Sequence, residues 1–230
     1  GPARLNAAVI AAFRPHLIGA DAGATEAIWQ TLYNQFRDQG QKGITITALS
    51  GVDIALWDIR GKQAGLPVHR LMGGPLRTRV QAYATGTYRL DEGDPFEYVV
   101  EEVRSYVDDG LPGVKLKIGR DVDEDVELTR AVRAAIGPDR MLMLDANHGY
   151  DAIDAIALGR RVADQNVMWF EEPVAPEDRA SYREVRRGQP IPVAGGECEF
   201  TRWGMVDIMT TRAMDILQPD TCAAGGLSEC

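Results

Sequence analysis

The chain has 230 residues, of which 45% are apolar and 26% are charged, and its formal net charge is -9 at pH 7. These values are ordinary for a globular protein and exclude disordered and collagen-like chains. The acidic balance disfavours nucleic acid as a partner, because nucleic-acid binders usually carry a basic surplus. No apolar run approaches the roughly 20 residues that a membrane helix needs. We therefore expect neither a nucleic-acid partner nor a membrane partner.

The cysteines and the first residues indicate a compartment. Cys198, Cys222 and Cys230 are odd in number and show no CxxC spacing, which argues against a disulfide framework or a zinc site. The first residues also lack the charged and apolar regions of a secretory signal. We therefore expect reduced thiols and a cytoplasmic location.

The first part of the chain predicts helices. Apolar residues between 48 and 59 recur three and four positions apart, which is the spacing of an amphipathic helix. Glycine and proline residues over 61–67 predict the end of this helix, and Gly73-Gly74-Pro75 interrupts the pattern. We place a domain boundary there, with a helical domain over 1–76 and a second domain over 77–230.

After this break, short apolar runs alternate with amphipathic helices such as those predicted over 96–107 and 122–136, and Asp151 is a predicted N-cap. Continuous apolar runs are typical of buried parallel strands. The six predicted strands are Val80–Ala84, Val114–Ile118, Met141–Leu144, Val167–Phe170, Ile191–Ala194 and Met214–Leu217. The alternation predicts an α/β protein, with either a doubly wound sheet or a (β/α)8 barrel.

Carboxylate residues follow three of these strands where each strand ends. Asp145, Glu171 and Glu197 are 26 residues apart each time, which is one strand–helix unit. Adjacent parallel strands would therefore bring them together at the C-terminal face of the sheet. Three converging carboxylates repel one another and need a cation. Because oxygen is the donor atom at all three positions, we predict Mg²⁺, with Mn²⁺ as a substitute.

Lys115 and Lys117 stand two positions apart in the run VKLKI, so both point to the same side of a strand. Two ammonium groups this close lower each other's pKa, which would let one of them accept a proton. Taken alone, such a pair is usually a solvated strand face, and Asp220 before Thr221 also fits a helix N-cap. The joint occurrence of complementary charges at consecutive strand ends favours the functional interpretation.

Three other residues receive a structural interpretation from the sequence. His148 lies beside Asn147 and could face the site, but a loop histidine is more often exposed, which is the interpretation we favour. We expect Trp57 and Trp169 to pack in the core or at an interface.

Five motifs together resemble the enolase superfamily, in its mandelate racemase subgroup within the mandelate racemase/muconate lactonizing enzyme family. They are VKLKIG at 114–119, LDANHGY at 144–150, WFEEP at 169–173, GGE at 195–197 and QPD at 218–220. The segment 47–74 is similar to the family's connection between capping domain and barrel. The resemblance implies a (β/α)8-type modified TIM barrel, here with about six strands, preceded by helices of an α+β capping domain. It also implies a homo-oligomer that acts on a small carboxylate substrate.

The resemblance also implies a role for each matching residue. Three carboxylates would bind Mg²⁺: Asp145, Glu171 and Glu197. Lys117 would abstract the proton alpha to the substrate carboxylate, while Lys115 would contact that carboxylate and lower the pKa of Lys117. Asn147 would reach a substrate oxygen, and Asp220 would orient a histidine on the following strand.

These roles imply a lyase of the acid-sugar dehydratase type, which removes an alpha-proton, forms an enediolate and expels a β-hydroxyl. A racemase or epimerase of a 2-hydroxy acid would use the same groups and is the alternative. A third reading is an inactive fragment, because the sequence to Cys230 contains neither the expected histidine nor strands seven and eight. For the same reason, we expect the 230 residues taken alone not to be a competent dehydratase or racemase.

Overall fold

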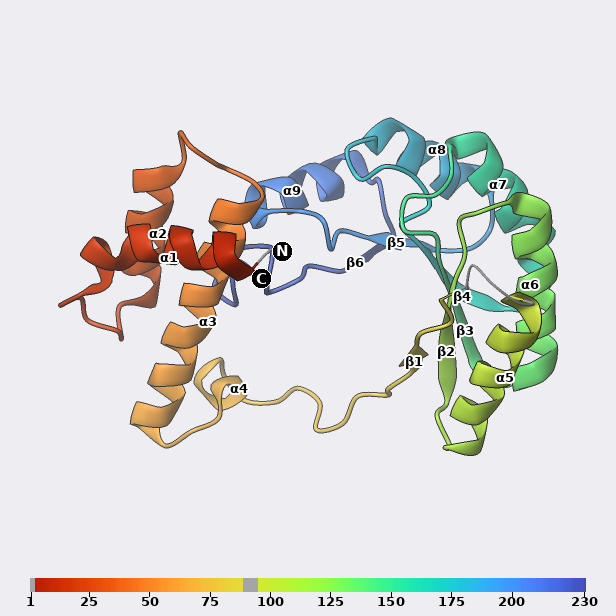
Figure 1. The fold of residues 1–230 in the computed structure, drawn as a ribbon, viewed down its shortest axis with the longest axis horizontal. Helices are drawn as coiled ribbons and strands as arrows, with labels where there is room; N and C mark the ends of the chain where they lie inside the picture. Colours follow the sequence, from red (N-terminus) through yellow and green to blue (C-terminus); the bar gives the residue numbers. More distant parts are fainter. Residues whose placement is uncertain (1–2, 89–94) are drawn as a thin grey trace. The chain divides into compact units, whose positions relative to one another are not determined.

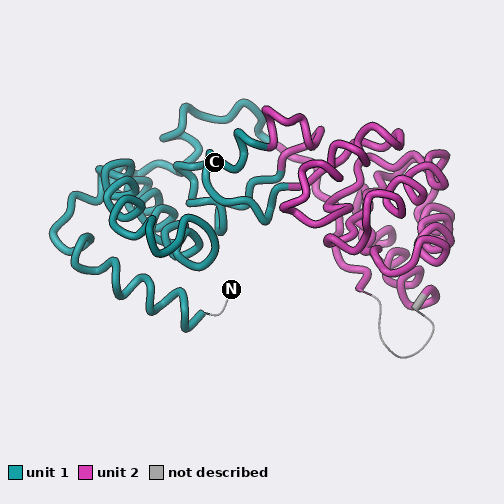
Figure 2. Tube along the Cα trace, turned by 90° about the horizontal axis from the view of Figure 1, so that it is seen from above, with its two compact units in different colours: residues 1–78, 196–207, 218–230 teal, residues 79–195, 208–217 magenta. Residues whose placement is uncertain are grey.

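The computed structural model describes residues 3–88 and 95–230. These residues form two compact units, shown in teal and magenta in Figure 2. Unit 1 contains residues 1–78, 196–207 and 218–230, and unit 2 contains residues 79–195 and 208–217. Two segments that follow strands late in the chain therefore belong to the same unit as the N-terminal helices.

Unit 1 is built on four helices, which Figure 1 labels α1 to α4. Their bounds are Ala3–Leu17 (α1), Thr25–Phe36 (α2), Ile44–Ala64 (α3) and Val68–Leu71 (α4). Helix α3 contains the predicted apolar stripe of residues 48–59, and it ends where Gly65 adopts a left-handed conformation with φ of 63°. Phe13, Trp29 and Leu49 are buried in the core that α1, α2 and α3 share.

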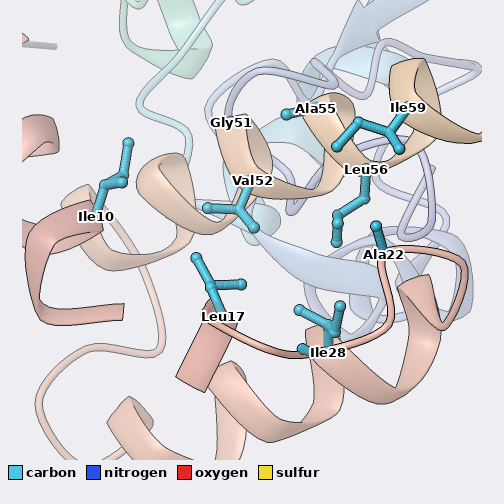
Figure 3. Close-up of a pocket in the computed structure, with 10 residues that line it drawn as sticks. Ile10, Leu17, Ala22, Ile28, Gly51, Val52, Ala55, Leu56 and Ile59 are labelled. Carbon is cyan, nitrogen blue, oxygen red and sulfur yellow. The ribbon is translucent and has the colours of Figure 1, made fainter. Parts of the chain in front are cut away.

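An apolar pocket of about 390 Å³ lies along this helical core (Figure 3). Leu17 and Ile28 line it from the α1 and α2 side, and Val52, Leu56 and Ile59 line it from α3. The three α3 residues belong to the predicted apolar stripe. The stripe therefore faces both the buried core and this pocket.

Unit 2 contains one parallel sheet whose strands pair in the order of the chain, from β1 to β6. The strands are Ala84–Thr85 (β1), Gly113–Lys117 (β2), Met141–Asp145 (β3), Val167–Glu171 (β4), Val193–Gly195 (β5) and Ile216–Leu217 (β6). The alternating helices are Pro95–Asp108 (α5), Val122–Ile136 (α6), Ala152–Arg161 (α7), Arg179–Gly188 (α8) and Thr201–Thr211 (α9), with a 3-10 turn η1 at Ala163–Gln165. Residues 201–207 of α9 belong to unit 1. Figure 1 shows α5 to α8 along the same side of the sheet.

Three of the predicted strands are shorter in the structure than in the sequence analysis. The run Val80–Ala84 is wrong for most of its length, since Val80 is 86% exposed and the strand pairing begins at Ala84. In the run Ile191–Ala194, Pro192 has no N–H to give to a ladder, and β5 begins at Val193. The run Met214–Leu217 pairs only at Ile216 and Leu217. Apolar composition alone therefore overestimates the length of the outer strands.

The predicted helix ends are confirmed where capping chemistry is present. The Asp151 carboxylate accepts a hydrogen bond of 2.9 Å from the Asp154 N–H at the start of α7. Gly137 ends α6 with a left-handed φ of 83°. Among the described residues, none of the helices combines the length and the apolar character needed to cross a membrane.

The loops that follow β2 and β3 are tied together by a buried carboxylate. Asp125, which is fully buried, accepts hydrogen bonds of 2.9 Å from both Gly119 N–H and Arg120 N–H. It also accepts a hydrogen bond from the hydroxyl of Tyr150. Gly119 has a φ of 104°, and a Cβ there would lie 2.4 Å from the Ala146 carbonyl oxygen. The close approach of the two loops therefore requires glycine at position 119.

We predict that Gly119→Ala lowers the free energy of unfolding by about 3 kcal/mol, because the cost of a strained backbone adds to the cost of steric overlap with Ala146. Gly110→Ala is the matched control, since Gly110 also has a positive φ of 80° but a Cβ there would meet nothing within 4 Å. The control should lose only about 1 kcal/mol. Urea unfolding of both variants measures the difference. Equal losses would show that the loops do not need this close approach.

Candidate active site

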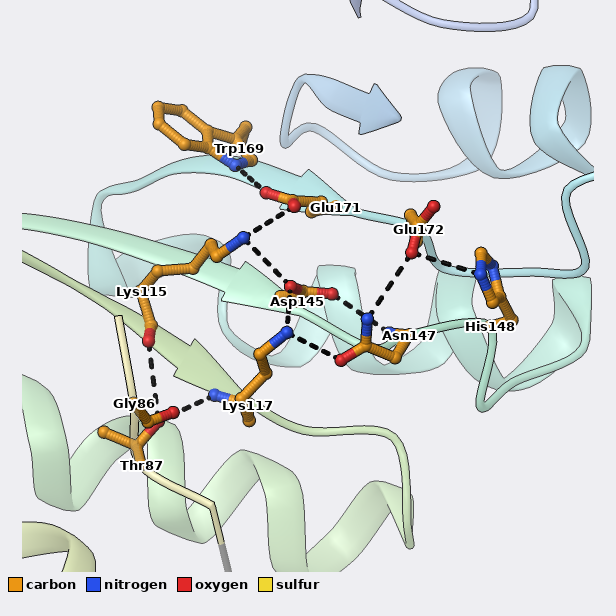
Figure 4. A network of polar contacts seen from close by, with 10 residues as sticks. All are labelled: Gly86, Thr87, Lys115, Lys117, Asp145, Asn147, His148, Trp169, Glu171 and Glu172. Atoms are coloured by element: carbon orange, nitrogen blue, oxygen red, sulfur yellow. Dashed lines mark hydrogen bonds and ion pairs between the residues drawn. The ribbon is translucent and has the colours of Figure 1, made fainter. Parts of the chain in front are cut away.

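The site in unit 2 is built on the C-terminal ends of three neighbouring strands (Figure 4). Lys117 on β2 is paired in register with Asp145 on β3, and Asp145 is paired with Glu171 on β4. Parallel pairing in this register places the three side chains at the same height of the sheet. Lys115, two positions before Lys117, projects to the same side.

Lys115 lies between two buried carboxylates. Its Nζ is 2.6 Å from Glu171 Oε1 and 3.0 Å from Asp145 Oδ2. Lys115 is 8% exposed, and the two acids are each 1% exposed. Removing one partner of such a buried group leaves an uncompensated charge, which is strongly destabilising. The three residues therefore depend on one another for stability.

Lys117 is the more accessible of the two lysines. Its Nζ donates to Asp145 Oδ2 at 2.6 Å and to Asn147 Oδ1 at 2.7 Å. It also lies 5.7 Å from the centre of the Tyr88 ring. Lys117, Tyr88, Asn147, Ile118 and Arg120 line a pocket of about 170 Å³. The ammonium group of Lys117 is thus fixed by two oxygen atoms at the wall of a small pocket.

The charges of this cluster shift the pKa values of its members. Burial alone would lower the pKa of Lys115, but its hydrogen bond to Glu171 and the charge of Asp145 outweigh burial, so the pKa lies above its usual value. Burial would raise the pKa of Asp145, but the bond from Lys117 and the charge of Lys115 lower it below the usual value. The expectation of a lowered pKa is therefore wrong for Lys115 here, because its ammonium group faces carboxylates.

Two residues that the sequence analysis treated as structural contact the site. His148 is not simply exposed: its Nε2 is 3.1 Å from Glu172 Oε2, and 27% of its side chain is accessible. Trp169 does more than pack, because its indole N–H donates to Glu171 Oε2 at 2.9 Å. Glu172, which is 1% exposed, also lies 3.5 Å from the Asn147 amide nitrogen. The EEP motif therefore supplies two buried carboxylates to this region.

Sequence reasoning missed Thr87, which follows β1 and is fully buried. Its Oγ1 accepts a hydrogen bond of 3.0 Å from the Lys117 N–H and donates to the Gly86 carbonyl at 2.6 Å. The Thr87 N–H donates in turn to Glu102 on α5 at 3.0 Å. Glu102 also accepts a bond of 2.5 Å from the Tyr106 hydroxyl, which raises the pKa of Tyr106 to about 12. A threonine three positions after the predicted strand Val80–Ala84 was the available sequence signal.

Four residues around the site hold left-handed backbone conformations that favour glycine. Their φ angles are 61° for Thr87, 42° for Asn147, 67° for His148 and 44° for Glu172. Each such residue costs on the order of 1–3 kcal/mol, and such strain clusters at functional sites. The surrounding contacts therefore hold these residues in place and offset the conformational strain of their backbone.

The other two predicted site residues, Glu197 and Asp220, belong to unit 1. Glu197 lies in the turn after β5, and Asp220 begins the turn after β6, where its Oδ1 accepts a bond of 2.7 Å from the Cys222 N–H. The alternative reading of Asp220 as a helix N-cap is wrong, because turns and not a helix follow it, and its carboxylate closes the first of these turns. Convergence of Glu197 with Asp145 and Glu171 stays a prediction.

The chemistry of the donor set fits a divalent cation. Asp145 and Glu171 present oxygen atoms, both within 3.0 Å of one cationic atom, Lys115 Nζ. Buried carboxylates that share a positive centre are the donors that Mg²⁺ prefers.

Two domain families match the chain. "Mandelate racemase / muconate lactonizing enzyme, N-terminal domain" matches residues 2–73, and "Enolase C-terminal domain-like" matches residues 98–230. The second match covers more than half of the sequence. The chain belongs to the mandelate racemase/muconate lactonizing enzyme family of the enolase superfamily. The α/β class predicted from the sequence is confirmed, together with the resemblance.

The relatives include cycloisomerases and acid-sugar dehydratases. The D-galactarolactone cycloisomerase of Agrobacterium fabrum is 52% identical over 229 residues, which are 100% of this chain and 61% of that protein. The arabinonate dehydratase of Saccharolobus solfataricus is 38% identical and is aligned over 94% of this chain and 58% of its own length. The chain thus spans about 60% of the length of these relatives.

Solved structures show the same likeness. The 3,6-anhydro-D-galactonate cycloisomerase from Zobellia galactanivorans has a TM-score of 0.95 and 41% identity, over 100% of this chain and 64% of that chain. A racemase from Streptomyces coelicolor with bound magnesium has a TM-score of 0.88 and 32% identity, over 94% of this chain and 60% of that chain. A member of the superfamily with this fold therefore binds magnesium.

We predict that Thr87→Val lowers the free energy of unfolding by about 1–3 kcal/mol, because the partly buried Lys117 N–H loses its acceptor. Thr87→Ser is the matched control, since it keeps the hydroxyl and should stay within about 1 kcal/mol of the original protein. Chemical denaturation compares the two variants. If the Val variant is as stable as the Ser variant, the Thr87 hydroxyl does not stabilise the backbone at Lys117.

Proposed function

We propose that this chain carries the base and the charge-stabilising groups of an enzyme that abstracts the proton alpha to the carboxylate of an acid sugar. The observation that carries the proposal is the placement of Lys117. Its Nζ sits at the wall of a pocket, held by Asp145 and Asn147 at 2.6 and 2.7 Å. A base must be held within reach of the proton that it takes, and these contacts restrict the ammonium group to one position.

The neighbouring side chains have complementary roles in this proposal. Lys117 in its neutral form takes the alpha-proton. Lys115 contributes a fixed positive charge toward the substrate carboxylate, where negative charge grows as the enediolate forms. Asn147, already bonded to Lys117, contacts a substrate oxygen and orients the substrate against the base.

Three carboxylates are proposed to hold one Mg²⁺ ion, with Mn²⁺ as an alternative: Asp145, Glu171 and Glu197. When bound, the ion supplies positive charge that stabilises negative charge on the substrate carboxylate. The Trp169 indole N–H and the Asn147 backbone N–H donate to the remaining oxygens of Glu171 and Asp145, at 2.9 and 3.0 Å. Such bonds orient the carboxylates that would hold the ion.

The second step of the proposed reaction is loss of the oxygen substituent on the β-carbon. If this oxygen is a hydroxyl, it leaves as water and the enzyme is a dehydratase, which is the reading that the sequence favours. If the oxygen belongs to a ring, the same elimination opens the ring without loss of atoms, and the reaction is an isomerisation. The 52% identity with a D-galactarolactone cycloisomerase favours this second candidate. Asp220 is proposed to orient the histidine that protonates the leaving oxygen.

We predict that Lys117→Ala in the full-length protein slows exchange of the substrate alpha-proton with solvent deuterium by about 10²–10⁴-fold. Proton NMR in deuterated buffer follows the exchange. Binding of Mg²⁺, measured by calorimetry, should remain within a few-fold of the original protein. Lys62→Ala is the matched control, because Lys62 is an exposed lysine paired only with Asp58 in the described structure. Exchange at the original rate in the Lys117 variant would contradict the assignment of the base.

The mass of the product distinguishes the two candidate reactions. The protein is incubated with Mg²⁺ and a panel of open-chain acid sugars, their lactones and anhydro sugar acids. A product lighter by one water identifies a dehydratase, and a keto acid with the mass of its cyclic substrate identifies a cycloisomerase. Exchange or inversion at the alpha-carbon without a keto product would instead show a racemase or epimerase.

A further inference from the structure

Helix α3 carries a second stripe besides its apolar one. Ser50, Asp53 and Trp57 are spaced three and four positions apart, so they lie on one side of the helix. Ser50 is fully buried and Asp53 is 1% exposed. Polar side chains this deeply buried need hydrogen-bond partners. The Ser50 hydroxyl donates to the Ile46 carbonyl within the helix, and both side chains accept hydrogen bonds from residues more than 170 positions away in the sequence.

The partners of this stripe lie in the segment Gly225–Ser228, which follows β6. The Gly225 N–H donates to Ser50 Oγ at 2.8 Å. The Ser228 N–H donates to Asp53 Oδ2 at 3.0 Å, and the Ser228 hydroxyl donates to Asp53 Oδ1 at 2.6 Å. Both oxygens of the Asp53 carboxylate are therefore used to hold Ser228.

Two tryptophans complete the hold on this segment. The indole N–H of Trp29 on α2 donates to the Gly225 carbonyl at 2.8 Å, and that of Trp57 donates to Ser228 Oγ at 3.0 Å. Trp29 is 1% exposed. We call these five hydrogen bonds the 225–228 clamp. Trp57 therefore belongs to a polar network and is not limited to packing.

The sequence of the held segment is adapted to this contact. Gly226 has a φ of 93°, and a Cβ there would lie 2.3 Å from Asp53 Oδ2. Burial raises the pKa of Asp53, and its hydrogen bonds to Ser228 only partly oppose this. An apolar residue of similar size would avoid the cost of burying a carboxylate. Asp53 is therefore best explained by the segment that it binds.

The clamp lies next to the turn that carries Asp220. The Cys222 N–H donates to Asp220 Oδ1 at 2.7 Å, and the Ala224 N–H donates to the Asp220 carbonyl at 2.7 Å. Gly225, the first residue of the clamp, follows Ala224 directly. Hydrogen bonds from helix α3 to Gly225, and the peptide link from Gly225 to Ala224, thus connect helix α3 with the turn that holds the Asp220 carboxylate.

We infer that Asp53 and Ser50 are positioning residues that fix the carboxylate of Asp220 through the 225–228 clamp. The inference rests on the function proposed above for Asp220, as the group that orients the proton donor of the second step. Helices of the N-terminal domain would then set the geometry of the elimination step, independently of the base Lys117.

Residue-level amide hydrogen exchange of the full-length protein tests this inference directly. In Asp53→Asn, the amides of Gly225, Ser228 and Cys222 should exchange about tenfold faster, the factor that corresponds to loss of one buried hydrogen bond. Amides of β2 to β4 should keep their rates. Asp58→Asn, an exposed position on the same helix, is the matched control and should change none of them. If Asp53→Asn fails to fold, Ser50→Ala takes its place in the experiment, because within the clamp it removes only the acceptor of the Gly225 N–H.

The Cys222 amide decides the outcome, because it reports on the Asp220 carboxylate itself. Exchange of Cys222 at the original rate, or an equal rise across the whole chain, would overturn the inference. Kinetics provide a second readout. Asp53→Asn should lower kcat for keto-acid formation while alpha-proton exchange continues. The double variant that combines Asp53→Asn with Asp220→Asn should be no slower than Asp220→Asn alone. Loss of both reactions together would show a merely structural role. If the original protein exchanges no alpha-proton, the proposed function fails, and the Cys222 result still decides the clamp.

Discussion

The in-register pairing of β2, β3 and β4 is the constraint on which the site depends. It aligns Lys117 with Asp145 and Asp145 with Glu171, and it inserts Lys115 between the two buried acids at 2.6 and 3.0 Å. Because a shift by one residue would turn these side chains to the opposite face, the charges can be satisfied in only one register. Only the observed strand alignment pairs these buried charges with one another, and pairing is what offsets the free-energy cost of burying them.

The rest of the fold holds this alignment in place. Thr87 bonds the backbone of β2, and Asp125 joins the loops after β2 and β3. The strained backbone at Asn147 and Glu172 is stable only because such contacts over-determine it. In unit 1, buried polar groups of α3 hold the segment beside Asp220. Both units therefore use buried hydrogen bonds to fix the loops that carry the proposed functional residues.

Much of the site could be predicted from the sequence, because parallel strands have a regular repeat and their C-terminal ends meet at one face. The run VKLKI and the strand-end residues Asp145 and Glu171 were found in this way. Thr87 was missed because its role depends on a hydrogen bond to Lys117, 30 positions away, which periodicity does not encode. The role of Trp169 was missed because its bond to the nearby Glu171 depends on side-chain direction, which the apolar pattern does not give. The length of β1 was overestimated because apolar residues near Val80 lack a paired neighbour. Likewise, the polar stripe of α3 has meaning only once its partners after β6 are known.

The central claim is that Asp145, Glu171 and Glu197 hold one divalent cation beside Lys117. Anomalous diffraction from crystals of the full-length protein grown with Mn²⁺ tests it most directly. The account predicts one anomalous peak with an oxygen atom of each of the three carboxylates at about 2.1 Å, a distance typical of a small hard cation. A peak that lacks Asp145 or Glu171 among its ligands, or crystals in which Lys115 still joins both acids and no ion is bound, would contradict it.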